Sequence, residues 1–238
     1  LWLIVGCAAA PPEVGLRGPA PRKKTAGFAL VGAGLIAAIL ILGMGMYVAG
    51  VARHESAMQS AAAALRRGDT PRATERLEIA QHAAGWDTTA LRWRVRLHAI
   101  EPMGGLVRAG REPTARRRVD EALAWIEDAV NTHGTPPTVA RLRAQLLARW
   151  ALATGDRPQD ITAAMQAYDQ LRPLSPYNVQ DAWMRADLAY RLGDLKRAQT
   201  HFREVLRLRE QMYLDPADPL TAGHLETALT VSGRPEAE

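Results

Sequence analysis

The stretch Gly193-Asp-Leu-Lys-Arg-Ala-Gln-Thr-His-Phe-Arg-Glu-Val205 returns in outline as Gly68-Asp-Thr-Pro-Arg-Ala-Thr-Glu-Arg-Leu-Glu-Ile-Ala80. In both stretches a Gly-Asp pair is followed at the same offsets by Ala, by a large apolar residue and by Ala or Val. Apolar residues at helical spacing mark a buried stripe, and Gly-Asp marks the corner that precedes it. The repeat therefore predicts helical hairpins that stack on one another.

The composition supports an all-α fold for the 238-residue chain, which contains only two Phe and one Cys. Ala, Leu and Arg are abundant, and these residues favour helices over strands. The chain has 30 basic and 25 acidic side chains, and residues 1–52 contain four of the basic ones and one of the acidic ones. The remaining residues therefore hold 26 basic and 24 acidic side chains. This near balance argues against a nucleic-acid partner.

No arrangement of residues typical of a catalytic, metal or cofactor site is found in the sequence. Cys7 is the single cysteine, so a disulfide framework or a thiolate metal site within the chain is excluded. The six His residues are scattered without a helical pair at three or four residues' spacing. We therefore expect no catalytic residue, no metal and no cofactor in this chain.

Residues 28–52 contain no charged side chain. As a helix these residues would reach about 37 Å, which exceeds the ~30 Å hydrocarbon layer of a bilayer. Arg17, Arg22, Lys23 and Lys24 precede the segment, whereas Arg53 and His54 follow it. The positive-inside rule then predicts a cytoplasmic N-terminal flank and an extracytoplasmic C-terminal domain at a bacterial inner membrane.

Two further segments precede this predicted membrane helix. We expect residues 1–10 to be the apolar tail of an earlier membrane helix, since the chain begins without Met and resembles a fragment. Residues 11–27 then form a cytoplasmic loop rich in Pro, Gly and basic residues. The alternative is a lipoprotein acylated at Cys7, but no basic leader precedes that residue.

After Arg53 the pattern changes to amphipathic helices over residues 55–210, with a capping helix expected at 218–231. The second predicted hairpin lacks the Gly-Asp corner, and we expect a long loop from Glu101 to Pro113 within it. Leu91 to Leu97 alternates like a strand, but the neighbouring helices favour a helix there. The four predicted hairpins cover residues 55–84, 87–132, 137–172 and 177–210.

These hairpins resemble the tetratricopeptide family, whose 34-residue units stack into an α-solenoid. The last unit matches best, with Ala182, Ala186, Gly193, Ala198 and Phe202 near the expected positions. The family binds peptides in a groove lined by the first helix of each pair, and so the resemblance implies a protein or peptide partner. By this resemblance the groove residues are Gln145, Arg149, Trp183, Asp187 and Tyr190.

A second candidate surface is basic and lies near the expected loop. An acidic glycan, a lipid phosphate or an acidic protein are its possible partners, while a solvated face is the default. Its residues are Arg92, Arg96, Arg108, Arg111, Arg116, Arg117 and Arg118. The Trp residues of the repeats are expected to fill gaps between units, with Trp183 as the exception.

A basic loop, a membrane helix and a tetratricopeptide-like tail together resemble the C-terminal part of bacterial O-antigen ligases and polymerases. This resemblance implies an accessory domain of an enzyme that transfers lipid-linked glycans, with that machinery as partner. The main hypothesis is instead a membrane-anchored extracytoplasmic module for protein–protein interaction. A third hypothesis is an assembly factor for respiratory or cytochrome complexes.

Overall fold

The computed structural model describes the backbone of residues 23–85, 87–212 and 230–231, and all regular structure in these residues is helical. The chain divides into two compact units, Leu1–Ala49 and Gly50–Glu238. In chain order the elements are α2 (Lys23–Arg66), α3 (Thr70–Ala83), α4 (Thr88–Val95), the π-helical turn η1 (Arg96–Ile100), α5 (Glu101–Arg108), α6 (Glu112–His133), α7 (Pro137–Ala153), α8 (Pro158–Leu171), the 3-10 turn η2 (Arg172–Leu174), α9 (Val179–Arg191) and α10 (Leu195–Met212).

The first unit contains the N-terminal part of α2. Its large apolar side chains from Leu35 to Val48 are all exposed. Among the described residues, Gly32–Arg66 is the one helical stretch long and apolar enough to cross a membrane. The predicted membrane segment 28–52 lies inside α2, which begins at Lys23 and so includes the end of the predicted loop 11–27. Residues 1–22, including Cys7, lie outside the described residues.

Helix α2 differs from prediction because it continues without a break to Arg66. A membrane helix over 28–52 and a separate helix from Glu55 were expected. No Pro and no left-handed Gly occurs between Ala52 and Arg66, and this Ala-rich stretch favours the helix throughout. The helix ends only at the corner formed by Gly68.

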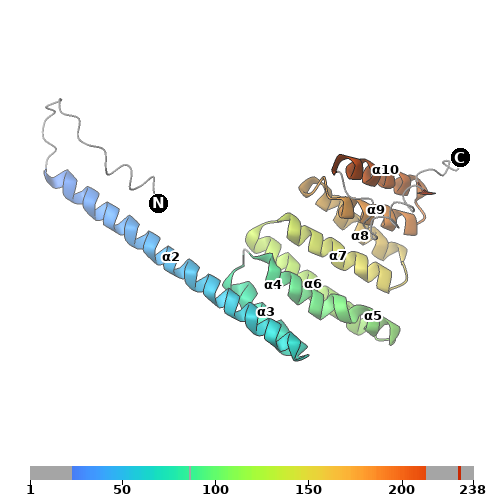
Figure 1. Ribbon diagram of the computed structural model, residues 1–238, viewed down its shortest axis with the longest axis horizontal. Helices are drawn as coiled ribbons and strands as arrows, with labels where there is room; N and C mark the ends of the chain where they lie inside the picture. Colours follow the sequence, from blue (N-terminus) through green and yellow to red (C-terminus); the bar gives the residue numbers. More distant parts are fainter. Residues whose placement is uncertain (1–22, 86, 213–229, 232–238) are drawn as a thin grey trace. The chain divides into compact units, whose positions relative to one another are not determined.

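The second unit consists of helical hairpins, which confirms the predicted all-α repeat fold. In Figure 1 α7, α8, α9 and α10 follow one another as packed layers. Each corner glycine, at residues 68, 110, 155 and 193, has a φ between 70° and 81°. At each corner the next residue donates its backbone N–H to the carbonyl five residues earlier, at 2.8 to 3.1 Å. This is the capping arrangement that a left-handed glycine permits.

The second hairpin therefore has the same corner as the others, although its sequence is Gly110-Arg111 instead of Gly-Asp. The corner requires the positive φ of glycine, whereas the Asp acts separately as a helix cap at two of the corners. Asp69 and Asp194 accept hydrogen bonds from backbone N–H groups at the starts of α3 and α10. Helix α6 has no side-chain cap of this kind, and Pro113 occupies its first turn.

The predicted long loop from Glu101 to Pro113 is wrong, because residues 101–108 form α5. Helix α4 continues into α5 through the π-helical turn η1. Pro102 has no N–H to donate to the carbonyl of His98, and its ring would crowd that carbonyl in a regular α-helix. The His98 carbonyl instead accepts a hydrogen bond from Arg118 Nη1 at 3.3 Å, while Met103 is buried. The helix predicted for Leu91 to Leu97 is confirmed.

Helix α7 joins the cores of successive hairpins. One side of α7, with Leu142, Leu146 and Trp150, packs in a cluster with α4, α5 and α6. Its other side, with Ala148 and Ala151, packs in a cluster with α8, α9 and α10. Because each hairpin hides its apolar stripe against a neighbour, the stack has the internal construction of a repeat protein.

The last hairpin is also covered by a residue from the C-terminal segment. Val231 is buried in the cluster formed with α9 and α10. The predicted capping helix at 218–231 otherwise lies outside the described residues, as does Trp86.

Candidate functional site

The predicted groove residues lie on α7 and α9, the first helices of the last two hairpins. Gln145 and Arg149 are exposed on α7 and one turn apart, while Tyr190 is 39% exposed on α9. These three side chains are accessible to a partner. Asp187 and Trp183 differ from them because both are already engaged within the domain.

Asp187 accepts a hydrogen bond from Arg191 Nε at 2.8 Å. Arg191 Nη1 also donates to Asp156 at 2.9 Å, and this bond ties α9 to the corner of the preceding hairpin. The two carboxylates raise the pKa of Arg191, mainly through the hydrogen bond with Asp187. Asp187 therefore holds the side chain of Arg191, which makes the contact with the preceding hairpin.

Trp183 is only 9% exposed, and its ring packs edge-on against Phe202 with the centroids 5.1 Å apart. This geometry is typical of an aromatic pair in a core. Trp150 is also buried, whereas Trp93 and Trp125 are partly buried against the cores. Tyr190 is thus the predicted groove residue that offers an accessible aromatic ring.

An ion pair joins α7 to α9 at the start of the two helices. Arg141 Nε lies 3.0 and 3.1 Å from the two carboxylate oxygens of Asp181, and Nη2 lies 2.9 Å from one of them. Nη2 also donates to Ser175 at 2.8 Å. The Asp181 carboxylate is 6% exposed, and its hydrogen bonds raise the pKa of Arg141. This bidentate contact sets the spacing between the two candidate groove helices.

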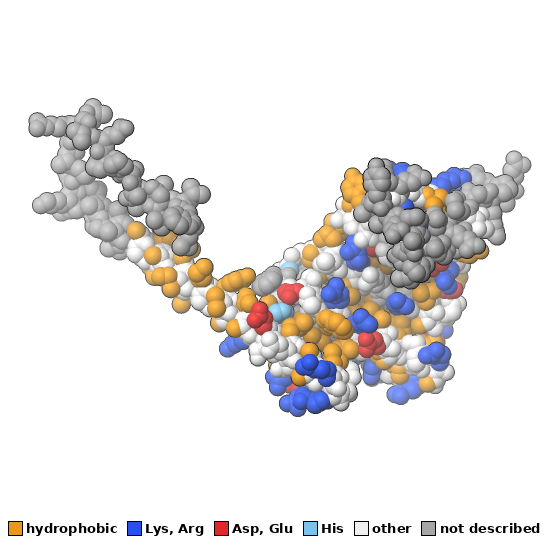
Figure 2. Space-filling model, viewed as in Figure 1, with side chains coloured by type: hydrophobic (Ala, Val, Ile, Leu, Met, Phe, Trp, Pro, Cys, Tyr) orange, Lys and Arg blue, Asp and Glu red, His pale blue; other side chains and the backbone are white. Residues whose placement is uncertain are grey.

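The predicted basic residues do not form one uniform site: all are exposed except Arg118, which is half-buried and bonded to the His98 carbonyl. Arg92 and Arg96 lie on α4 and η1, whereas Arg108, Arg111, Arg116 and Arg117 lie around the corner between α5 and α6. Arg96 is paired with Glu101 at 3.0 Å, and Arg116 with Asp120 at 3.0 Å. Figure 2 shows Lys and Arg side chains dispersed over the visible face of the domain.

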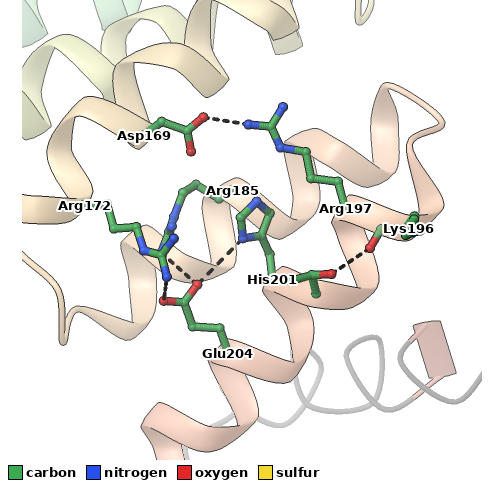
Figure 3. A network of polar contacts seen from close by, with 8 residues as sticks. Asp169, Arg172, Arg185, Lys196, Arg197, His201 and Glu204 are labelled. Atoms are coloured by element: carbon green, nitrogen blue, oxygen red, sulfur yellow. Dashed lines mark hydrogen bonds and ion pairs between the residues drawn. The ribbon is translucent and has the colours of Figure 1, made fainter.

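A polar network in the last hairpin was missed by sequence reasoning (Figure 3). Glu204 of α10 is paired with Arg185 of α9 at 3.3 Å and with Arg172 at 3.2 Å. The Arg185 side chain is only 4% exposed, and its Nε and Nη1 have no hydrogen-bond partner among the residues that the structure describes. Burial and the charge of Arg185 lower the pKa of the neighbouring His201.

The one sequence signal for this network is that Arg185 lies in the buried stripe of α9, at a position where an apolar residue is expected. Ala182 and Ala186 on either side of it are fully buried. An Arg in such a stripe needs a buried acidic partner, and Glu204 lies on the next helix. The spacing of the two residues in sequence does not identify the pair.

Among the residues that the structure describes, no three His, Cys, Asp or Glu side chains are grouped so that they could hold a metal ion.

No protein-family profile matches the chain, and no curated protein matches it. A solved structure with similarity to the chain is a tetratricopeptide repeat protein from Parabacteroides merdae ATCC 43184. The two are 16% identical, with a TM-score of 0.27, and the match covers 76% of this chain and 74% of that one. The comparisons give no support to the resemblance to O-antigen ligases. The tetratricopeptide-like character of the domain rests on its own hairpins and corners.

Proposed function

We propose that the chain is a membrane-anchored, extracytoplasmic module that binds a protein or peptide partner through the outward face of α7 and α9. The observation that carries this proposal is the exposure of Gln145 and Arg149 on α7 and of Tyr190 on α9, the first helices of the last two hairpins. The ion pair between Arg141 and Asp181 holds the two helices at a set spacing. A preorganised face loses little conformational entropy when a partner binds.

The apolar half of α2 supports the anchor. Large aliphatic side chains from Leu35 to Val48 are exposed on all sides of the helix, at 59% to 73%. A helix that is apolar all round has no polar face to turn to water and is stable in a bilayer. The basic residues before this stretch favour a cytoplasmic N-terminal side.

Site-specific photo-crosslinking in membranes of the native host tests the proposed face. A photoreactive amino acid at Gln145, Arg149 or Tyr190 should give one discrete crosslinked product. The matched control is Gln166, an exposed glutamine on α8, the second helix of its hairpin. Equal crosslinking from Gln166, or no product from all three groove positions, would show that α7 and α9 do not form the binding face.

A further inference from the structure

A cavity of about 520 Å³ lies where the first two hairpins end and the next helices begin. It is bounded by the C-terminal ends of α3 and α6 and by the starts of α4 and α7. Leu91, Ala129 and Val139 supply apolar lining, and Asp87 and Asp128 supply carboxylates. The volume lies in the range of sites that bind small molecules.

The cavity depends on close contact between the two hairpin ends. Gly85 lies against the ring of His133, and a Cβ at residue 85 would overlap Nε2 of that ring. Both residues line the cavity. Any larger residue at position 85 would therefore displace His133 and change the shape of the cavity.

Asp87 is held in a defined orientation at the edge of this cavity. One carboxylate oxygen accepts the backbone N–H of Thr89 at 2.8 Å, and the other lies 3.0 Å from Nε2 of the buried His54. Burial opposes ionisation of Asp87, but the hydrogen bonds from Thr89 and the interaction with His54 together lower its pKa. Asp87 therefore remains a carboxylate at neutral pH.

The lining of this cavity contrasts with the rest of an arginine-rich chain. No Lys or Arg lines it, whereas Arg118 or Arg143 lines each of three other cavities of the described domain. The carboxylate of Asp128 is exposed and has no ion pair within the described residues. In Figure 2 acidic and His side chains gather beside the start of α4, on a face where Lys and Arg predominate.

We propose that this cavity binds a lysine or arginine side chain from an extended basic segment of the partner protein. The apolar lining would cover the methylene groups of that side chain, and Asp128 and Asp87 would pair with its charged end. The inference rests on the proposed function, since it gives the chemistry of the partner that the module recruits. It assigns to that partner a second point of contact, separate from α7 and α9.

Fluorescence anisotropy with the full chain in phosphatidylcholine nanodiscs tests the inference. The probe is a labelled peptide of alternating Lys and Ser, and the comparison peptides carry acetyl-lysine or Glu in place of Lys. The chain has a net charge of +5, so non-specific attraction works against the Lys peptide. We expect binding of the Lys peptide and no binding of the other two. Equal binding of the acetyl-lysine peptide would overturn the proposal.

The decisive pair of variants is Asp128→Asn and Glu127→Gln. Each removes one exposed carboxylate, but Glu127 lines a different cavity, between α6 and α8. Asp128→Asn should weaken Lys-peptide binding about fivefold, as expected for one exposed ion pair. Glu127→Gln should leave it unchanged, and equal losses in both variants would contradict a specific site.

A third variant tests the shape of the cavity. Gly85→Ala should also weaken binding, because the added Cβ displaces His133. A helical circular dichroism spectrum establishes that each variant is folded. If crosslinking identifies a partner at α7 and α9 while Asp128→Asn binds the Lys peptide normally, the cavity proposal alone is wrong. If no groove position gives a crosslinked product while Asp128→Asn still weakens binding of the Lys peptide, only the proposed face on α7 and α9 is wrong.

Discussion

Single residues in this domain connect hairpins that are far apart in sequence. Arg141 and Asp181 are 40 positions apart, yet their side chains share three hydrogen bonds. Asp156 and Arg191, 35 positions apart, connect the same two hairpins at the corner. Such pairs determine how consecutive hairpins sit on one another, because each joins a residue of one hairpin to a residue of the next.

Replacing Arg141 with Met should destabilise the domain by about 2 kcal/mol or more, since the buried Asp181 carboxylate loses its partner. Chemical denaturation of the full chain measures this change. Arg143→Met on the same helix is the control, because Arg143 is exposed and lacks an ion pair among the described residues. Adding Asp181→Asn to Arg141→Met should restore part of the loss.

The stability of the last hairpin should depend on pH through His201. This residue is buried among Arg185, Arg197, Asp169 and Glu204, and burial lowers its pKa from the ordinary 6.5. The unfolded chain therefore takes up a proton at His201 more readily than the folded chain does. The stability that neutral His201 contributes is fully present above the pKa of His201 in the unfolded chain. This stability is lost as the pH falls through the lower pKa that His201 has in the folded chain.

Thermal unfolding of the wild type and of His201→Gln between pH 7.5 and 5 tests this dependence. The wild type should lose more stability than the variant as the pH falls below about 6.5, the ordinary His pKa. His82→Gln changes an exposed His and should behave like the wild type. The same pH slope for wild type and His201→Gln would mean that His201 does not control this transition.

At the scale of helices, the corner glycine and the small residues opposite it define each hairpin. Ala73, Ala164 and Ala198 are all fully buried on second helices. Ala115 and Ala122 of α6 are buried in the same way, although the corner before them lacks Asp. Small side chains at these positions allow the two helices of a hairpin to approach closely, so a larger or charged residue would separate them.

Ala198→Asp places a charge without a partner at one of these contacts and should cost about 3 kcal/mol or more. Thr200→Asp on the same helix is exposed and should change stability by less than about 0.5 kcal/mol. The melting temperatures of the two variants give the comparison. An unchanged melting temperature in Ala198→Asp would show that the repeat register assigned to α9 and α10 is incorrect.

At the scale of the whole molecule, the chain combines an exposed apolar helix with a domain of nearly balanced charge. Gly32–Arg66 has the length and composition of a membrane span, and the described part of the chain buries none of its apolar stretch. The basic residues before the span support the proposed orientation, with the hairpins outside the cytoplasm.

The orientation can be tested by protease accessibility in intact spheroplasts. A tag after Glu238 should be digested by added protease, while a tag before Leu1 should be protected. Permeabilised spheroplasts, in which both tags are digested, show that the tags are cleavable. Protection of the C-terminal tag in intact spheroplasts would mean that the hairpins face the cytoplasm.

Local signals in the sequence were sufficient to predict the all-α repeat fold. Gly68, Gly155 and Gly193 identify three corners, because only glycine adopts their positive φ without strain. The corner at Gly110 and the helix α5 were missed. There the corner glycine is followed by Arg instead of Asp, and α4 continues into α5 through a π-helical turn, whose His98 carbonyl accepts a hydrogen bond from Arg118 of another helix.

The amino-acid sequence by itself determined the helical class, three of the corner glycines and the apolar stretch of α2, since each depends on neighbours within a few residues. Only the tertiary structure decided that Asp187 and Trp183 are engaged inside the domain while Tyr190 remains accessible. It also decided that Asp87 and Asp128 border one cavity. These side chains meet partners from other helices, and such contacts exist only after the hairpins have stacked.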